Sequence, residues 1–259
     1  MKKLKFAFSP CPNDTYIMYA IVHKKINLHG LEFEFVIQDI EKLNQAALNK
    51  ETDITKASAA ILPLVKSAYS LLDSGAAFGL EGGPLLISRK ETQLNENSII
   101  AIPGELTSAY ALFKRYYKKP CNTQFVLFSD IFGLLASERI DAGVVIHEDR
   151  FTFWEHGFEC VSDLGLEWKN DTGLPVPLGV FIAHQSLDTN TQQLLNIIIS
   201  ESIQYATVHY DEVFPWIKEH ARNEHPAVIK KHIDYYVNDL SENMGDTGRE
   251  AIKQLYEAH

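Results

Sequence analysis

The chain has 259 residues, of which 46% are hydrophobic and 22% are charged, a mix typical of a folded globular protein and not of a disordered one. Its 24 basic and 34 acidic side chains give a net charge of −10 without any cluster of Lys and Arg, which argues against a nucleic-acid partner. No apolar run approaches the roughly 20 residues that span a bilayer, and no signal-peptide pattern follows the basic N-terminus. We therefore expect a cytoplasmic protein without membrane insertion. An anionic small molecule remains a possible partner, because helix N-termini and one well-placed lysine can bind an anion despite an acidic surface.

The patterns of cysteine, histidine and glycine argue against disulfide, metal and nucleotide-binding sites. The three cysteines, Cys11, Cys121 and Cys160, are odd in number, and their spacing fits neither a disulfide framework nor a zinc site. The ten histidines form no HxH or HExxH pattern, so we expect no metal. The glycines between 75 and 83 form neither GxGxxG nor a phosphate-binding loop, which gives no support to nucleotide binding.

The first third of the chain alternates strand and helix patterns. Strands are predicted at 4–8, 31–37 and 53–55, and helices at 16–22, at 40–50 and from about Ser58. The loop at 9–15 (Ser-Pro-Cys-Pro-Asn-Asp-Thr) joins the first strand to its helix, where Asn13 or Asp14 can cap the helix. Open α/β sheets bind ligands at such strand ends, although a plain capped turn is an equally good interpretation of the loop alone.

A second α/β unit begins near residue 95. Its predicted strands are 98–102, 124–128 and 142–146, its helices are 109–119 and 131–139, and the apolar segment 176–183 leads back to helices at 192–208, 228–237 and 249–256. This order predicts an α/β fold of the two-lobed, type 2 periplasmic-binding-protein kind, with a ligand cleft between the lobes. Residues 1–92 and 182–259 would form the large lobe and 93–181 the inserted small lobe, with strands near 84–90 and 178–184 as paired hinges.

His147 is the strongest single candidate for chemistry. It follows the buried-type strand 142–146, so its side chain is expected at a strand end, facing the cleft. Histidine titrates nearest to neutrality and suits proton abstraction, and Glu148 or Asp149 could orient the ring. Taken alone, a histidine in an ordinary strand-end loop is the competing interpretation.

Two further junctions carry polar side chains. At 55–58, which we expect to be a strand-to-helix junction, Lys56 can neutralise a carboxylate and Ser58 can donate a hydrogen bond. Thr107 and Ser108 repeat this arrangement in the other lobe. Each junction alone also fits a simple helix cap. The convergence of four such loops, two from each lobe, favours a site.

These motifs resemble those of the 1,4-dihydroxy-6-naphthoate synthase family, which acts in the futalosine route to menaquinone. The matching segments keep their order along nearly the whole chain: 9–15, Thr55, Lys56 and Ser58, Pro103, Gly104 and Thr107, 145–152, and 172–179. The loop at 9–15 and the run Ile146-His147-Glu148 are the most specific of them.

The resemblance implies a lyase that cleaves a carbon–carbon bond of cyclic dehypoxanthinyl futalosine without metal or organic cofactor. It implies His147 as proton acceptor, and its substrate-contacting positions are Asn13, Lys56, Ala57, Ser58, Thr107 and Ser108. The substrate would be an anionic, aromatic carboxylate. The alternatives are a related enzyme of the same pathway, similar to chorismate dehydratase, and a non-catalytic small-molecule-binding protein. The sequence leaves the oligomeric state open.

Overall fold

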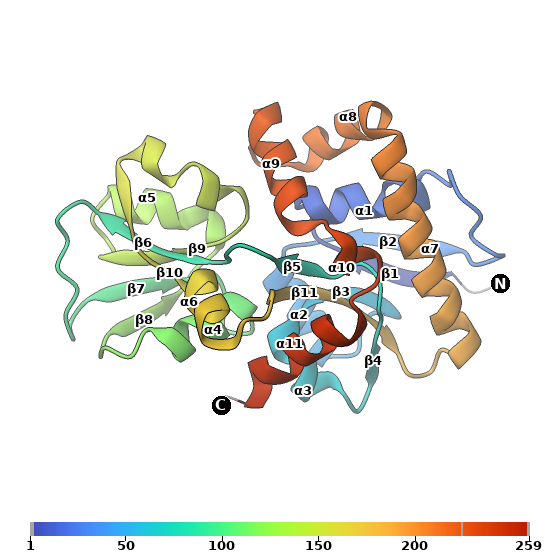
Figure 1. Ribbon diagram of the computed structural model, residues 1–259, viewed down its shortest axis with the longest axis horizontal. Coiled ribbons are helices and arrows are strands. Elements are labelled where there is room, and N and C mark those ends of the chain that lie inside the picture. Colours follow the sequence, from blue (N-terminus) through green and yellow to red (C-terminus); the bar gives the residue numbers. More distant parts are fainter. Residues whose placement is uncertain (1–2, 224, 258–259) are drawn as a thin grey trace.

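Two mixed β-sheets organise the protein, each with its own helices. A computed structural model describes residues 3–223 and 225–257. Figure 1 shows the first sheet and most helices in one half of the molecule and the second sheet with α4, α5 and α6 in the other. The predicted α/β class is confirmed.

The first sheet has the strand order β2-β1-β3-β11-β4, and β5 also pairs with β11. Parallel pairing joins β1 (Leu4–Phe8) to β2 (Phe33–Ile37) and β3 (Ile54–Ser58). The long strand β11 (Val176–His184) runs antiparallel to β3, to β4 (Tyr69–Leu71) and to β5 (Ala77–Gly79).

The side chains of this sheet contribute to two hydrophobic cores, one on each face, because successive strand residues face opposite sides. Phe6, Ile54 and Phe181 pack against α1 (Pro12–Val22), α7 (Thr189–Val208), α8 (Tyr210–His220) and α9 (Pro226–Tyr236). On the other face, Val180 and Ile182 belong to a core that includes residues of α2 (Ile40–Leu48), α3 (Leu62–Val65) and α11 (Gly245–Glu257). The helix α10 (Asp239–Glu242) is a single turn before α11.

The second sheet has the order β10-β6-β9-β7-β8. Its strands are β6 (Leu85–Arg89), β7 (Ile99–Ile102), β8 (Asn122–Phe125), β9 (Ala142–Val145) and β10 (Phe158–Asp163). Its helices are α4 (Ser108–Tyr116), α5 (Ile131–Ala136) and α6 (Leu164–Thr172), and short 3-10 turns, η2 (Phe128–Asp130), η3 (His147–Phe151) and η4 (Phe153–His156), lie between them. Another such turn, η1 (Ala59–Ile61), follows β3 in the first unit.

The chain passes from the first sheet to the second between β5 and β6 and returns between α6 and β11. The first passage lies against the start of α6: a Cβ on Gly165 would collide with the backbone of Gly82 and Gly83. Only glycine permits this close approach. The division into lobes at 92/93 and 181/182 stays a prediction; by sheet membership, β6 belongs to the second sheet and β11 to the first.

Three local predictions need correction. The helix α1 begins after Cys11, its N-cap, so Asn13 and Asp14 lie inside the helix and do not cap it. Residues 55–58 are not a strand-to-helix junction but part of β3, because pairing with β11 continues as far as Ser58. The predicted strand 124–128 lies at 122–125, and the sequence patterns did not reveal β4, β5, β10, α6, α8 and α10.

Candidate active site

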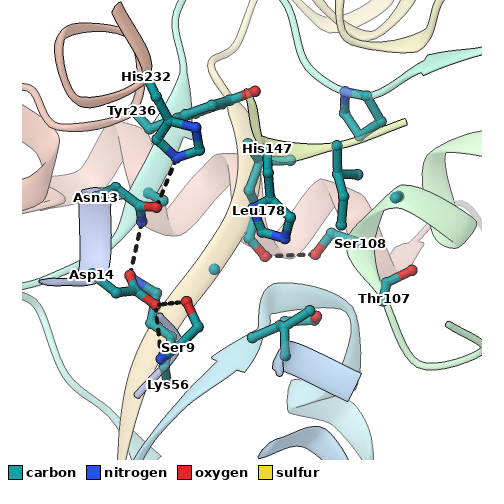
Figure 2. Close-up of a pocket in the computed structure, with 17 residues that line it drawn as sticks. Ser9, Asn13, Asp14, Lys56, Thr107, Ser108, His147, Leu178, His232 and Tyr236 are labelled. Atoms are coloured by element: carbon teal, nitrogen blue, oxygen red, sulfur yellow. Dashed lines mark hydrogen bonds and ion pairs between the residues drawn. The ribbon is translucent and has the colours of Figure 1, made fainter. Parts of the chain in front are cut away.

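A cavity lies where loops from the two sheets meet. It encloses about 630 Å³ of space between atoms, a volume that includes open solvent at its mouth. Figure 2 shows its polar side chains converging from α1, β3, the start of α4, the turn after β9, and α9. The lining residues are Ser9, Asn13, Asp14, Ile40, Lys56, Ser58, Ala77, Pro84, Thr107, Ser108, Ala109, Ile146, His147, Leu178, Gly179, His232 and Tyr236.

A buried ion pair forms one wall of this cavity. The Lys56 Nζ atom lies 2.7 Å from Asp14 Oδ1 and donates a hydrogen bond to the carbonyl oxygen of Gly75 at 2.8 Å. Both charged side chains are only 2% exposed. The Ser9 hydroxyl donates to Asp14 Oδ2 at 2.6 Å, and Asn13 Nδ2 donates to Asp14 Oδ1 at 2.8 Å. The carboxylate therefore has a hydrogen-bond partner on each oxygen and a cation beside it.

His147 lies on the opposite wall, at the start of the turn after β9. Its backbone has φ of 57°, in the left-handed region that non-glycine residues rarely adopt and that is concentrated at functional sites. The ring packs edge-on against Phe128, with centroids 4.7 Å apart, and its Nδ1 lies 3.2 Å from the Cys11 sulfur. Desolvation in this setting lowers the pKa of His147 to about 4, although Asp39 and Asp14 oppose the shift. The imidazole is therefore neutral at neutral pH and can accept a proton.

A second imidazole, His232 on α9, lines the same cavity. Its Nε2 lies 2.9 Å from Asn13 Oδ1, and its ring stacks on that of His147 with centroids 6.1 Å apart. Burial lowers the pKa of His232 well below its usual value, and the neighbouring His147 adds to this effect. Both rings are thus neutral at neutral pH, and a chain of contacts leads from Lys56 through Asp14 and Asn13 to His232.

Two acidic side chains follow His147 in its turn. Burial raises the pKa of Glu148 to about 7 and that of Asp149 to about 6. Glu148 Oε2 lies 3.8 Å from His232 Nδ1. Neutral rings beside carboxyls that titrate near neutrality are typical of sites that handle protons, although buried ion-pair networks also shift pKa values.

Hydroxyl groups meet at the beginning of α4. The Thr107 hydroxyl accepts a hydrogen bond from the backbone N–H of Tyr110 and so caps this nine-residue helix. The Ser108 hydroxyl donates to the carbonyl oxygen of Leu178 at 2.7 Å. Ser58, from β3, holds Asn44 through its hydroxyl and its backbone N–H. Because backbone N–H groups at a helix N-terminus favour negative charge, this corner of the cavity suits a carboxylate.

Six of the seven side chains predicted for the site line the cavity: Asn13, Lys56, Ser58, Thr107, Ser108 and His147. Ala57 does not line it. It is fully buried and belongs to the hydrophobic core, because alternation along β3 turns it away from its neighbours Lys56 and Ser58.

Two residues of α9 that line the cavity, His232 and Tyr236, were not predicted from the sequence. The available signal was the spacing Ile229, His232, Ile233 and Tyr236, which places a histidine on the buried stripe of a helix. Within residues 3–223 and 225–257, no group of three His, Cys, Asp or Glu side chains is arranged to hold a metal ion. No helix in that part of the chain is long and apolar enough to cross a membrane.

Fold and cavity define the class of protein. A ligand-binding component of an ABC-type import system from Staphylococcus aureus shares the fold with a TM-score of 0.75 at 12% identity, over 100% of this chain and 92% of its own. The periplasmic aliphatic sulphonate binding protein of Escherichia coli does so with a TM-score of 0.68 at 9% identity, over 99% and 87% of the two chains. The protein thus has a periplasmic-binding-protein-like fold, as predicted.

Sequence comparisons narrow the class to a family. A sequence profile described as menaquinone biosynthesis matches residues 4–259. Proteins named 1,4-dihydroxy-6-naphthoate synthase are 36% identical in Thermus thermophilus, over 99% of this chain and 93% of the relative, and 34% identical in Streptomyces coelicolor, over 97% and 91%. A crystal structure of an Archaeoglobus fulgidus protein superposes with a TM-score of 0.94 at 33% identity, over 99% and 96% of the two chains. The chain belongs to the menaquinone biosynthesis family.

Proposed function

We propose that the protein is a 1,4-dihydroxy-6-naphthoate synthase, a lyase that converts cyclic dehypoxanthinyl futalosine to 1,4-dihydroxy-6-naphthoate. Two named relatives, similar over almost their whole length, support the reaction. The observation that carries the chemistry is His147: a neutral imidazole on the wall of the cavity, with its backbone in the left-handed region. In this proposal His147 is the proton acceptor.

The reaction needs a base and a fixed approach geometry. When His147 removes a proton from a substrate hydroxyl or carbon acid, the electron pair left behind drives cleavage of the ring bond, and the released naphthoate gains aromatic stabilisation. A positioned base typically contributes about 10²–10⁴-fold to the rate. The surrounding loops would exclude water and hold the bond to be broken against the imidazole.

The substrate we propose is an anionic, aromatic carboxylate. Its carboxylate would lie at the N-terminus of α4, where Ser58, Thr107 and Ser108 meet, and its ring would contact the apolar lining formed by Ile40, Ile146 and Leu178. Asn13 and Lys56 would complete the polar wall. We further propose that residues 1–92 with 182–259 and residues 93–181 act as two lobes that close on this substrate. The unpaired state of all three cysteines supports a cytoplasmic site of action.

The test is to incubate the purified protein with cyclic dehypoxanthinyl futalosine and follow formation of the naphthoate by mass spectrometry. The proposal predicts product with the wild-type protein and product formation at least about 100-fold slower with His147→Asn, while calorimetry shows that the variant still binds the substrate. Binding without product by the wild-type protein would favour a non-catalytic binding protein, and turnover of chorismate would favour the related dehydratase. Turnover by His147→Asn close to that of the wild type would refute the role of this residue.

A further inference from the structure

Two buried titratable groups beside the cavity have no part in the function proposed above: Glu148 and His232. Their side chains are 6% and 1% exposed, and they come from different halves of the fold, Glu148 from the turn after β9 and His232 from α9. The Glu148 carboxyl oxygen and His232 Nδ1 lie 3.8 Å apart, too far for a formed hydrogen bond. His232 Nδ1 has no hydrogen-bond partner among the described residues.

The contacts of Asn13 determine which nitrogen of His232 carries the proton. Asp14 is held by Lys56 and Ser9 and accepts from Asn13, so the Asn13 amide nitrogen faces Asp14. The Asn13 oxygen must then face His232 Nε2, and an oxygen can only accept a hydrogen bond. In the neutral ring, the proton therefore resides on Nε2 and a lone pair on Nδ1 faces Glu148.

An ionised Glu148 would direct a second lone pair at that of Nδ1, and the two would repel each other. A protonated carboxyl converts this repulsion into an O–H···N attraction. The charged or titratable groups that bear on the two side chains are Asp149, Arg222, Cys11, His147 and Tyr236, whose ring lies against that of His232 with centroids 4.9 Å apart. Of these only Arg222 is a cation at neutral pH, and it lies on the loop between α8 and α9, in an exposed position. Burial raises the pKa of Glu148 to about 7, so the protonated carboxyl is accessible at neutral pH.

This contact bears directly on His147, the neighbour of Glu148 in the chain. The strained backbone of His147 persists only if its surroundings hold it, and the Glu148–His232 contact joins its turn to α9. We propose that His232 is a positioning residue for His147, which it holds in place through its contact with Glu148, a contact that is attractive while the Glu148 carboxyl is protonated. This inference rests on the proposed function, in which His147 is the base.

Two substitutions at position 232 distinguish the contact of Nε2 with Asn13 from the contact of Nδ1 with Glu148. A glutamine amide reaches the position of Nε2, so His232→Gln keeps a donor for Asn13 and loses the group that faces Glu148. An asparagine amide occupies the position of Nδ1, so His232→Asn keeps a polar partner for Glu148 and loses the bond to Asn13. We expect His232→Gln to lower kcat about 10- to 100-fold with a smaller change in KM, because small misplacements of a catalytic group are costly. His232→Asn should recover most of that kcat.

The control is His225→Gln, the same change at an exposed position beside the start of α9, which should leave kcat and KM unchanged. A pH profile adds a readout that a purely structural role would not change. In the wild type, kcat should fall as the pH rises through about 7 and Glu148 loses its proton; Glu148→Gln, which cannot ionise, should remove this fall. Wild-type kcat and pH dependence in His232→Gln would overturn the inference while leaving the role of His147 intact.

A measurement independent of turnover separates this inference from the proposed function. Nitrogen-15 NMR of histidine-labelled protein should show the His232 proton on Nε2, with Nδ1 shifting as Glu148 titrates. A proton on Nδ1 would overturn the inference even if the enzyme makes naphthoate. If the enzyme makes none, the proposed function fails while the NMR result still decides the protonation of the pair.

Discussion

The two polar walls of the cavity differ in how completely their groups are paired. On the first-sheet side, Lys56 and Asp14 form a buried ion pair, and Ser9 and Asn13 supply further donors to the carboxylate. On the second-sheet side, His147 has a strained backbone, and the only polar side-chain contact described for its ring is with the Cys11 sulfur. The comparison indicates that one wall provides stability and a fixed geometry, whereas the other carries His147, the proposed base.

The largest expected effect lies on the reactive wall. His147→Asn should lower kcat by about 10²–10⁴-fold or more, because it removes the proposed base. Asparagine tolerates positive φ better than most residues, so the free energy of unfolding should stay near that of the wild type. Naphthoate production and urea denaturation, measured on the same preparation, test both parts. A large loss of stability in this variant would contradict the distinction between the two walls.

On the paired wall, the expected effect is on stability. Lys56→Met leaves Asp14 buried without its cation, which should cost about 3–5 kcal/mol of unfolding free energy. The double variant Lys56→Met/Asp14→Asn removes both charges and should recover part of this loss. Urea denaturation of the two variants provides the comparison. Equal stability of Lys56→Met and the wild type would show that the ion pair does not stabilise this wall.

The pH dependence of stability sharpens the comparison at the turn after β9. Burial raises the pKa of Glu148 from its usual 4.5 to about 7, so its contribution to stability is present below pH 4.5 and is lost as the pH rises to 7. His147 acts in the opposite sense: with its pKa lowered from 6.5 to about 4, its contribution is lost as the pH falls from 6.5 to 4. The two slopes oppose each other in the wild type.

Glu148→Gln should leave the contribution of His147 as the remaining one of these two opposing contributions to the pH dependence of the unfolding free energy. Relative to the wild type, the variant should gain up to about 3 kcal/mol between pH 4.5 and 7, because its amide cannot ionise. Urea denaturation at several pH values measures this difference. The matched control is Glu159→Gln, an exposed position on β10, which should show no such gain. A difference that is constant across this pH range would contradict the assigned titration of Glu148.

The smallest effect concerns the helix that forms the proposed carboxylate corner. Thr107→Ala removes the cap of α4 and should cost about 1 kcal/mol of unfolding free energy. Thr107→Ser retains a hydroxyl at the cap and should restore most of it. A cost well above this range for the alanine variant would show that Thr107 has a structural role beyond capping.

Much of the fold was predictable because its signals are local. The β1–α1, β2–α2 and β7–α4 pairs have strong apolar patterns, and strand-end placement of His147 follows from the buried run that ends at Ile146. Segment 55–58 shows where prediction from local patterns fails. There, β3 extends to Ser58 only because a distant strand, β11, pairs with it. A hydrogen-bonded partner more than a hundred residues away leaves no trace in the local pattern.

The site was predictable in part for the same reason. Residues at strand ends reach the cavity by topology, whereas His232 reaches it because α9 packs against α1 and against η3, the turn after β9. Its contacts to Asn13 and Glu148 span 219 and 84 positions of the chain. The burial of Lys56 was likewise not predictable, because no residue near it in the sequence indicates Asp14 as its partner. The sequence motifs predicted six residues that line the cavity, but the contacts between them could be identified only from the fold.

The most direct test of the account is a crystal structure of His147→Asn with cyclic dehypoxanthinyl futalosine bound. We predict that the substrate occupies the cavity with its carboxylate at the N-terminus of α4 and the proton to be removed within hydrogen-bond distance of residue 147. A substrate bound in another place, or with its reacting bond remote from residue 147 and facing Lys56 and Asp14, would contradict the division of roles between the two walls.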